Sequence, residues 1–181
     1  MIVELTCSTP RAASGSVSRF ELSTPRLVLR DFTPEDEAAF IAYRADAAEG
    51  RELVERFAAW RRAEPRLNFQ VAVCRRDEGA TLIGCCGLRR EGFAERIAEF
   101  GLELAPAWQG RYRYAMEITE AMLAHGFETL GLDEILSNTT EDNVRVHRLA
   151  RWYGATAASR GDGKVCWHFG REAWRQAMRG R

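Results

Sequence analysis

The chain of 181 residues contains no long hydrophobic run, no excess of either charge and a single lysine, Lys164. No apolar stretch approaches the ~20 residues that a helix needs to cross a bilayer, so we expect no membrane association. Lys+Arg and Asp+Glu both number 26, and this balance leaves no overall field that would attract a nucleic acid. The first residues lack the basic and apolar regions of a secretory signal, which predicts a cytoplasmic protein.

The residue spacings that bind metals are missing too. None of the five cysteines belongs to a C-x-x-C pair, and the three histidines are far apart in the sequence. We therefore expect reduced, packed cysteines and no metal site. Hydrophobic residues make up 46% and charged residues 29%, a balance typical of one folded domain. Residues 1–19 are small and polar and predict a flexible leader, which leaves 20–181 as the single domain.

Hydrophobic periodicity predicts a mixture of strands and helices. The predicted strands cover 25–30, 67–73, 81–88, 96–104, 135–138, 155–159 and 165–169. The first predicted helix opens at Thr33, as its cap, and Pro34, and the others cover 50–62, 112–130, 143–153 and 172–178. Because strands and helices mix without strict alternation, we expect an α/β (α+β) fold with a mixed, twisted sheet and helices on both faces.

One connection between a predicted strand and a predicted helix could bind an anion. W-Q-G-R at Trp108–Arg111 lies between the strand that ends near Ala105 and the long helix that starts near Tyr112. The first turn of a helix has backbone N–H groups without partners and a partial positive charge, and Arg111 and Arg113 add full charges. From these residues alone, an ordinary connection with solvated arginines is the simpler interpretation.

Five motif-like segments follow one another along the chain. They are T-P-R-L-V-L-R at Thr24–Arg30, L-I-G-C-C-G-L at Leu82–Leu88, A-E-F-G-L-E-L at Ala98–Leu104, W-Q-G-R with Y-A-M-E at Trp108–Glu117, and N-V-R-V-H-R-L-A-R-W-Y-G-A at Asn143–Ala155. Each is weak alone. In this order and context, the sequence resembles the GNAT N-acetyltransferases, most closely the branch that includes the ribosomal-protein alanine acetyltransferases.

The resemblance implies a single-domain GNAT fold whose mostly antiparallel sheet is splayed at its centre, with acetyl-CoA between the separated strands. It implies transfer of an acetyl group to a primary amine, on a protein or peptide N-terminus or on a small molecule, by direct attack in a ternary complex. The cofactor-binding residues that it implies are Leu102, Leu104, Gln109, Gly110, Arg111, Tyr112, Arg113, Tyr114, Ala115, Asn138, Asn143 and Arg148. The expected partners are an acyl-CoA and an amine-bearing acceptor, without nucleic acid or membrane, and a homodimer is compatible with this set.

Glu99 and Glu103 are the candidate catalytic residues, because alternation along the predicted strand places both carboxylates on one face. Glu99 also matches a strand glutamate of the family in the role of base. Exposed or salt-bridged carboxylates are an equally good interpretation of both residues. An α-amine with a pKa of ~8 is about one-tenth neutral at pH 7, whereas a lysine amine with a pKa of ~10.4 is hardly ever neutral. The lack of a conspicuous base therefore favours an α-amine or another small primary amine as the acceptor.

Two departures from the family pattern leave an alternative open. Tyr112 and Arg113 stand where the resemblance places a second glycine, and Ala150 stands where many relatives have a tyrosine acid. Either the arginines replace lost backbone contacts to phosphate, or the loop no longer holds a pyrophosphate. The second case predicts a GNAT-fold binding module without catalytic turnover.

Overall fold

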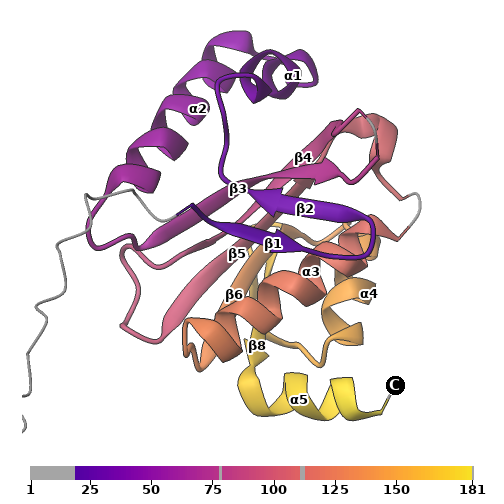
Figure 1. Cartoon of the computed structure of the whole chain (residues 1–181). Helices are drawn as coiled ribbons and strands as arrows, with labels where there is room; N and C mark the ends of the chain where they lie inside the picture. The colour runs from indigo at the N-terminus through magenta and orange to yellow at the C-terminus, as the bar shows by residue number, and fades with distance from the viewer. Residues whose placement is uncertain (1–18, 78, 111–112, 181) are drawn as a thin grey trace, which may run out of the picture.

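The computed structural model describes residues 19–77, 79–110 and 113–180, which form a mixed sheet with helices on both faces (Figure 1). The strands are β1 (Glu21–Ser23), β2 (Leu27–Arg30), β3 (Asn68–Arg75), β4 (Leu82–Arg89), β5 (Ile97–Leu104), β6 (Glu134–Thr140), β7 (Thr156–Gly161) and β8 (Lys164–Gly170). The helices are α1 (Asp36–Ala42), α2 (Ala47–Arg62), α3 (Tyr114–Ala124), α4 (Val144–Trp152) and α5 (Arg171–Arg179). A 3-10 turn, η1 (Pro106–Trp108), precedes α3, and a π-helical turn, η2 (His125–Thr129), continues it.

The sheet separates at its centre. Its strands follow the order β1-β2-β3-β4-β5-β6-β8-β7, and neighbours are antiparallel except β5 and β6, which are parallel. Pairing between β5 and β6 covers only Ile97–Glu99 against Glu134–Leu136, so the remainders of these two described strands diverge. This confirms the predicted mostly antiparallel sheet with a central splay.

Apolar residues on the two faces of the sheet build two cores. On one face, Val71 and Phe100 pack in a cluster with Ile118 of α3 and residues of α4 and α5. On the other, Ala72 packs with Phe57 of α2 and with α1. Alternate residues of β3 therefore enter opposite cores, as expected for a strand covered on both faces. In Figure 1, α1 and α2 lie above the sheet and α3, α4 and α5 below it.

The structure differs from the sequence-based expectations at the N-terminal end. β1 has no predicted counterpart, since three residues are too few to show a period. The predicted cap at Thr33 is wrong, because α1 begins only at Asp36. That carboxylate pairs with Arg30 and accepts a hydrogen bond from the Thr33 backbone N–H at 2.8 Å. Residues 1–18 of the predicted leader lie outside the described residues.

In the described ranges, no helix combines sufficient length with sufficient apolar character to cross a membrane.

Candidate active site

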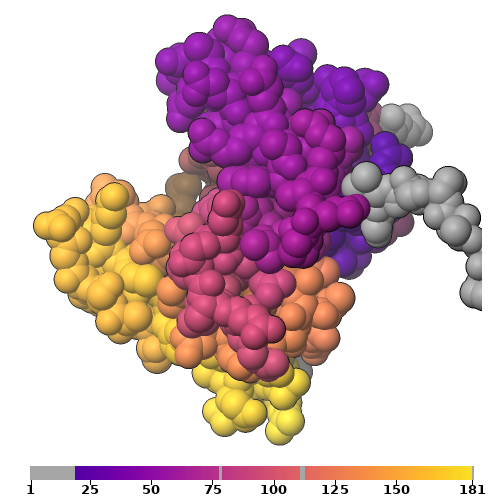
Figure 2. Space-filling view, turned by 90° about the vertical axis from the view of Figure 1, so that its left-hand side faces the viewer, coloured from indigo at the N-terminus to yellow at the C-terminus, as the bar shows by residue number. Residues whose placement is uncertain are grey.

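A cleft of about 790 Å³ opens where β5 and β6 separate. Its walls come from these two strands, from the loop and first turn of α3, and from α4. In the space-filling view of Figure 2, the N-terminal helices (purple) stand apart from the C-terminal elements (orange and yellow), and the surface is hollowed between them. The splay therefore provides a cavity of the size that small-molecule sites have.

The open edge of β5 presents backbone donors to this cleft. The Ala105 N–H donates to the Ile83 carbonyl of β4 at 2.9 Å. Because amide directions alternate along an antiparallel strand, the N–H groups of Leu102 and Leu104 point the other way, toward β6. β6 pairs with β5 only as far as Glu99, so these N–H groups face the cleft. Such an edge can hold an extended ligand by strand-like hydrogen bonds.

The wide end of the cleft is closed by the loop between β5 and α3. The side-chain amide of Gln109 donates to the Leu104 carbonyl at 2.8 Å and holds the loop against the end of β5. Gly110 has a φ of +68°, a conformation that favours glycine. Arg113, the N-cap of α3, is also left-handed with a φ of +58°. Gly110 and Arg113 thus both have left-handed backbone conformations, which are unfavourable for residues with a Cβ.

The cleft brings together most of the residues that the sequence singled out. Those that line it are Glu99, Leu102, Glu103, Leu104, Gln109, Gly110, Arg113, Ala115, Asn138, Asn143 and Arg148. The predicted loop residues Arg111 and Tyr112 lie outside the described residues. The Tyr114 side chain is instead buried in the core, with the Trp108 ring centroid 6.1 Å from its own and the Arg26 guanidinium 4.7 Å away. Its ring therefore packs the first turn of α3 against the core.

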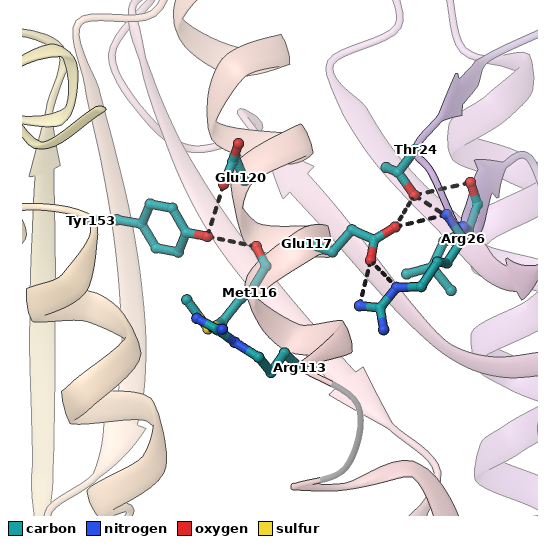
Figure 3. A network of polar contacts seen from close by, with 8 residues as sticks. Thr24, Arg26, Arg113, Met116, Glu117, Glu120 and Tyr153 are labelled. Atoms are coloured by element: carbon teal, nitrogen blue, oxygen red, sulfur yellow. Dashed lines mark hydrogen bonds and ion pairs between the residues drawn. The ribbon is translucent and has the colours of Figure 1, made fainter. Parts of the chain in front are cut away.

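Hydrogen bonds on two flanks fix the first turns of α3 (Figure 3). On one flank, Glu117 accepts from the Thr24 hydroxyl at 2.5 Å and from Arg26 Nε at 2.7 Å. On the other, the Tyr153 hydroxyl, just beyond α4, donates to the Met116 carbonyl at 2.8 Å. The helix end that carries the cleft loop is therefore anchored to the connection between β1 and β2 and to the C-terminal end of α4.

The charge of Glu117 strengthens this anchor. Burial alone would raise the pKa of its carboxyl, but the hydrogen bonds from Thr24 and Arg26 outweigh burial and lower the pKa below its ordinary value of 4.5. A carboxyl with a lowered folded-state pKa stabilises the fold above its unfolded pKa, and this contribution is lost as pH falls through the folded value.

Replacing Glu117 by glutamine is expected to reduce the free energy of unfolding by about 1.5–3 kcal/mol at neutral pH, the usual range for a hydrogen-bonded charge. Urea unfolding of both proteins between neutral pH and about pH 3 measures the effect. The difference should shrink below pH 4.5, where the wild-type carboxyl begins to take up its proton in the unfolded chain. Glu128→Gln, at an exposed position of η2, is the control and should change little. A Glu117→Gln effect that is the same at every pH would contradict the ionic anchor.

Both candidate carboxylates are held by arginines that sequence reasoning missed. Glu99 accepts from Arg89 Nη2 at 3.0 Å and from Asn138 Nδ2 at 3.1 Å, so it links three neighbouring strands at the narrow end of the cleft. Glu103 is paired with Arg44 Nη2 at 2.8 Å and has a more exposed side chain, at 44% against 26% for Glu99. Each carboxylate is thus oriented by an ion pair. Salt-bridged carboxylates were the structural interpretation that the sequence allowed as an alternative to catalysis.

No tyrosine or cysteine occurs among the described residues that line the cleft. Ala150, at the position where an acid was considered, is buried in the core. The nearby Tyr153 hydroxyl is engaged by Met116 and lies 3.3 Å from Glu120 Oε2. The described residues therefore supply no tyrosine acid to the cleft.

The start of α4 forms the wall opposite the loop. Asn143 is the N-cap, its Oδ1 accepts from the Val146 N–H at 3.2 Å, and the residue lines the cleft. Arg148 and Arg145 line the same wall. Arg145 was not predicted. Its position two residues after the Asn143 cap, in the first turn of the predicted helix, could have indicated it from the sequence.

Comparison with known proteins agrees with this arrangement. Residues 26–156 match the family described as Acetyltransferase (GNAT) domain. An uncharacterized N-acetyltransferase of Bacillus subtilis (strain 168), YoaA, is 32% identical over 143 residues, which is 71% of this chain and 78% of that protein.

Solved structures show the same fold. A GNAT-family acetyltransferase from Bacillus anthracis superposes with a TM-score of 0.69 at 18% identity, covering 84% of this chain and 99% of the other. An acetyltransferase from Agrobacterium tumefaciens str. C58 has a TM-score of 0.69 at 23% identity, covering 88% and 99%. Since the family match spans most of the sequence and the fold agrees with it, this chain belongs to the GNAT family of acetyltransferases.

Proposed function

We propose that this protein transfers an acetyl group from acetyl-CoA to a primary amine, with an α-amine or another small primary amine as the acceptor. The observation that carries the proposal is the open edge of β5, where the N–H groups of Leu102 and Leu104 face a cleft that ends at Gly110. Pantetheine is an extended chain with amide groups, and a pyrophosphate follows it. A strand edge that leads to a helix N-terminus matches both parts.

The residues of the cleft fit this substrate. Leu102 and Leu104 would bind the pantetheine amides through their backbone. Gly110 and Arg113 would hold the pyrophosphate with the neighbouring Arg111 and Tyr112, and Asn143 and Arg148 would contact the cofactor from α4. Gly110 has a φ of +68°, which favours glycine, and a guanidinium lies within 2.8 Å of where a Cβ would be, so a cation is next to the proposed phosphate position.

The proposed reaction is direct attack of the neutral amine on the thioester carbonyl. A C–N bond forms and the C–S bond breaks, so that CoA leaves as a thiolate, which takes up a proton from the solvent. A backbone N–H of β5 would stabilise the negative charge that develops on the carbonyl oxygen. Glu99 would accept the proton of the amine through a water molecule, and Arg89 and Asn138 hold its carboxylate in position.

Direct attack is supported over a covalent acyl-cysteine because no activated thiol faces the described part of the cleft. Cys85, which is paired with Glu103 in the β4–β5 register, is buried, and burial raises the pKa of its thiol to about 12. A neutral thiol is a poor nucleophile.

The charges in the cleft support an acceptor with a single amine. Glu99 and Glu103 each have an arginine partner already, so the described lining offers no group of unpaired carboxylates for a polyamine. An α-amine also needs less help from a base at neutral pH than a lysine amine does.

Thiol release from acetyl-CoA, measured with a panel of α-amino peptides, aminoglycosides and polyamines, tests the proposed function. Calorimetric titration with CoA accompanies it. We expect micromolar CoA binding and thiol release that depends on an amine, with α-amines the best acceptors. Binding without release on any amine would support the binding module instead, and the absence of both would overturn the proposal.

A further inference from the structure

The guanidinium of Arg145 lies against Gly110 at the wide end of the cleft. A Cβ on Gly110 would be 2.8 Å from Arg145 Nη1 and 2.9 Å from its Cζ. Arg145 belongs to the first turn of α4, whereas Gly110 precedes α3, so this contact joins the N-terminal ends of two helices across the cleft. The φ of +68° at this position favours glycine, and the guanidinium lies directly against its backbone.

The charge of this guanidinium is not balanced by a carboxylate in the described part of the chain. The described ion pairs include neither Arg145 nor Arg148. The carboxylates of the cleft, Glu99 and Glu103, are each paired with an arginine of their own. The wide end of the cleft therefore has an excess of positive charge, which an anionic ligand would neutralise.

A second arginine is placed beside the loop despite its backbone conformation. Arg113 has a φ of +58°, where any residue other than glycine is disfavoured. Its Nε contacts Met116 Sδ at 3.3 Å, while the residue as a whole lines the cleft. A guanidinium offers two parallel N–H groups and a full charge to a phosphate, and a backbone N–H offers only one donor.

We propose that Arg145 is a phosphate-binding residue that, together with Arg113, grips the pyrophosphate of CoA from the α4 side of the cleft. This inference rests on the proposed function and adds to it a residue from a different helix. It assigns the pyrophosphate two guanidinium groups, one from the first turn of α4 and one from the N-cap of α3.

Equilibrium titrations of wild type, Arg145→Ala and Arg145→Lys test this role. The ligands are CoA, dephospho-CoA, which keeps the pyrophosphate but lacks the 3′-phosphate, and pantetheine, which has neither. Arg151→Ala is the matched control, because Arg151 lies on the same helix and packs over the Trp167 ring, 5.2 Å from its centroid, outside the cleft lining. Thermal unfolding of each variant measures whether the fold is kept.

We expect Arg145→Ala to weaken CoA and dephospho-CoA equally, by about tenfold to a hundredfold, and to leave pantetheine binding unchanged. Arg145→Lys should recover part of the loss, and Arg151→Ala should match wild type. CoA affinity within twofold of wild type in Arg145→Ala would overturn the inference, as would a loss confined to CoA or one shared with pantetheine. Absence of CoA binding by wild type would instead overturn the proposed function, so the two failures are distinguishable.

Discussion

Replacing Glu99 by glutamine is expected to lower kcat about a hundredfold, near the lower end of what a general base contributes. Glutamine keeps the shape of the side chain and can still accept from Asn138, but it cannot take a proton from the attacking amine. The effect is placed near the lower end because an α-amine is already about one-tenth neutral at pH 7 and needs less help from a base. Affinity for CoA should change little, since in the proposed complex Glu99 would lie near the reacting thioester and not near the phosphates.

Glu103→Gln provides the matched comparison on the same face of β5. Its partner Arg44 belongs to the segment after α1, on the side of the sheet away from α3. We expect a change within about tenfold, mainly in the KM for the acceptor. Steady-state kinetics with the best amine of the panel measure both variants. A larger loss of kcat in Glu103→Gln would assign the base to Glu103, and full activity of both variants would exclude a carboxylate base in this cleft.

Gly84→Ala is expected to destabilise the protein by about 3 kcal/mol or more, as overpacking against the backbone does. A Cβ at Gly84 would lie 2.1 Å from the Glu103 carbonyl oxygen and 2.9 Å from the Leu104 Cα. Both contacts are with backbone atoms of β5, which no side-chain rotation can relieve. The alanine would therefore push β5 away from β4, and the displaced strand is the one whose free edge faces the cleft.

Urea unfolding and CoA titration of Gly84→Ala measure these two effects together. We expect loss of stability and weaker CoA binding in the same variant. Gly161→Ala, in β7, is the control, because a Cβ there meets nothing within 4 Å, and its stability should stay within about 0.5 kcal/mol of wild type. Wild-type stability in Gly84→Ala would mean that β4 and β5 are less closely packed than this structure shows.

Local periodicity was sufficient to predict most elements of the fold. The alternation at Ile97–Leu104 and the long apolar pattern that became α3 and η2 were both found, because each spans enough residues to show its period. β1 was missed since it has three residues and is defined by pairing with β2. The cap at Thr33 was wrong because Pro34 and Glu35 form a turn before the helix, and the Asp36 carboxylate accepts from the Thr33 N–H.

The cleft residues also divide into those that the sequence predicts and those that it does not. Glu99, Glu103, Gly110 and Asn143 could be found because they belong to ordered motifs or to a strand with clear alternation. Their arginine partners could not, because pairs such as Arg44 with Glu103, 59 residues apart, depend on how distant elements pack. Chain spacing carries no information about such contacts until the sheet order is known.

Residue-resolved amide hydrogen exchange of the wild-type protein, with and without saturating acetyl-CoA, tests most directly whether the splayed strands bind this substrate. We expect the amides of Leu102 and Leu104 to exchange at least about tenfold more slowly with acetyl-CoA. The reason is that the carbonyl oxygens of pantetheine would accept hydrogen bonds from these two N–H groups. Exchange in β7, outside the cleft lining, should not change. Exchange of Leu102 and Leu104 that is the same with and without acetyl-CoA would contradict binding along the open edge of β5.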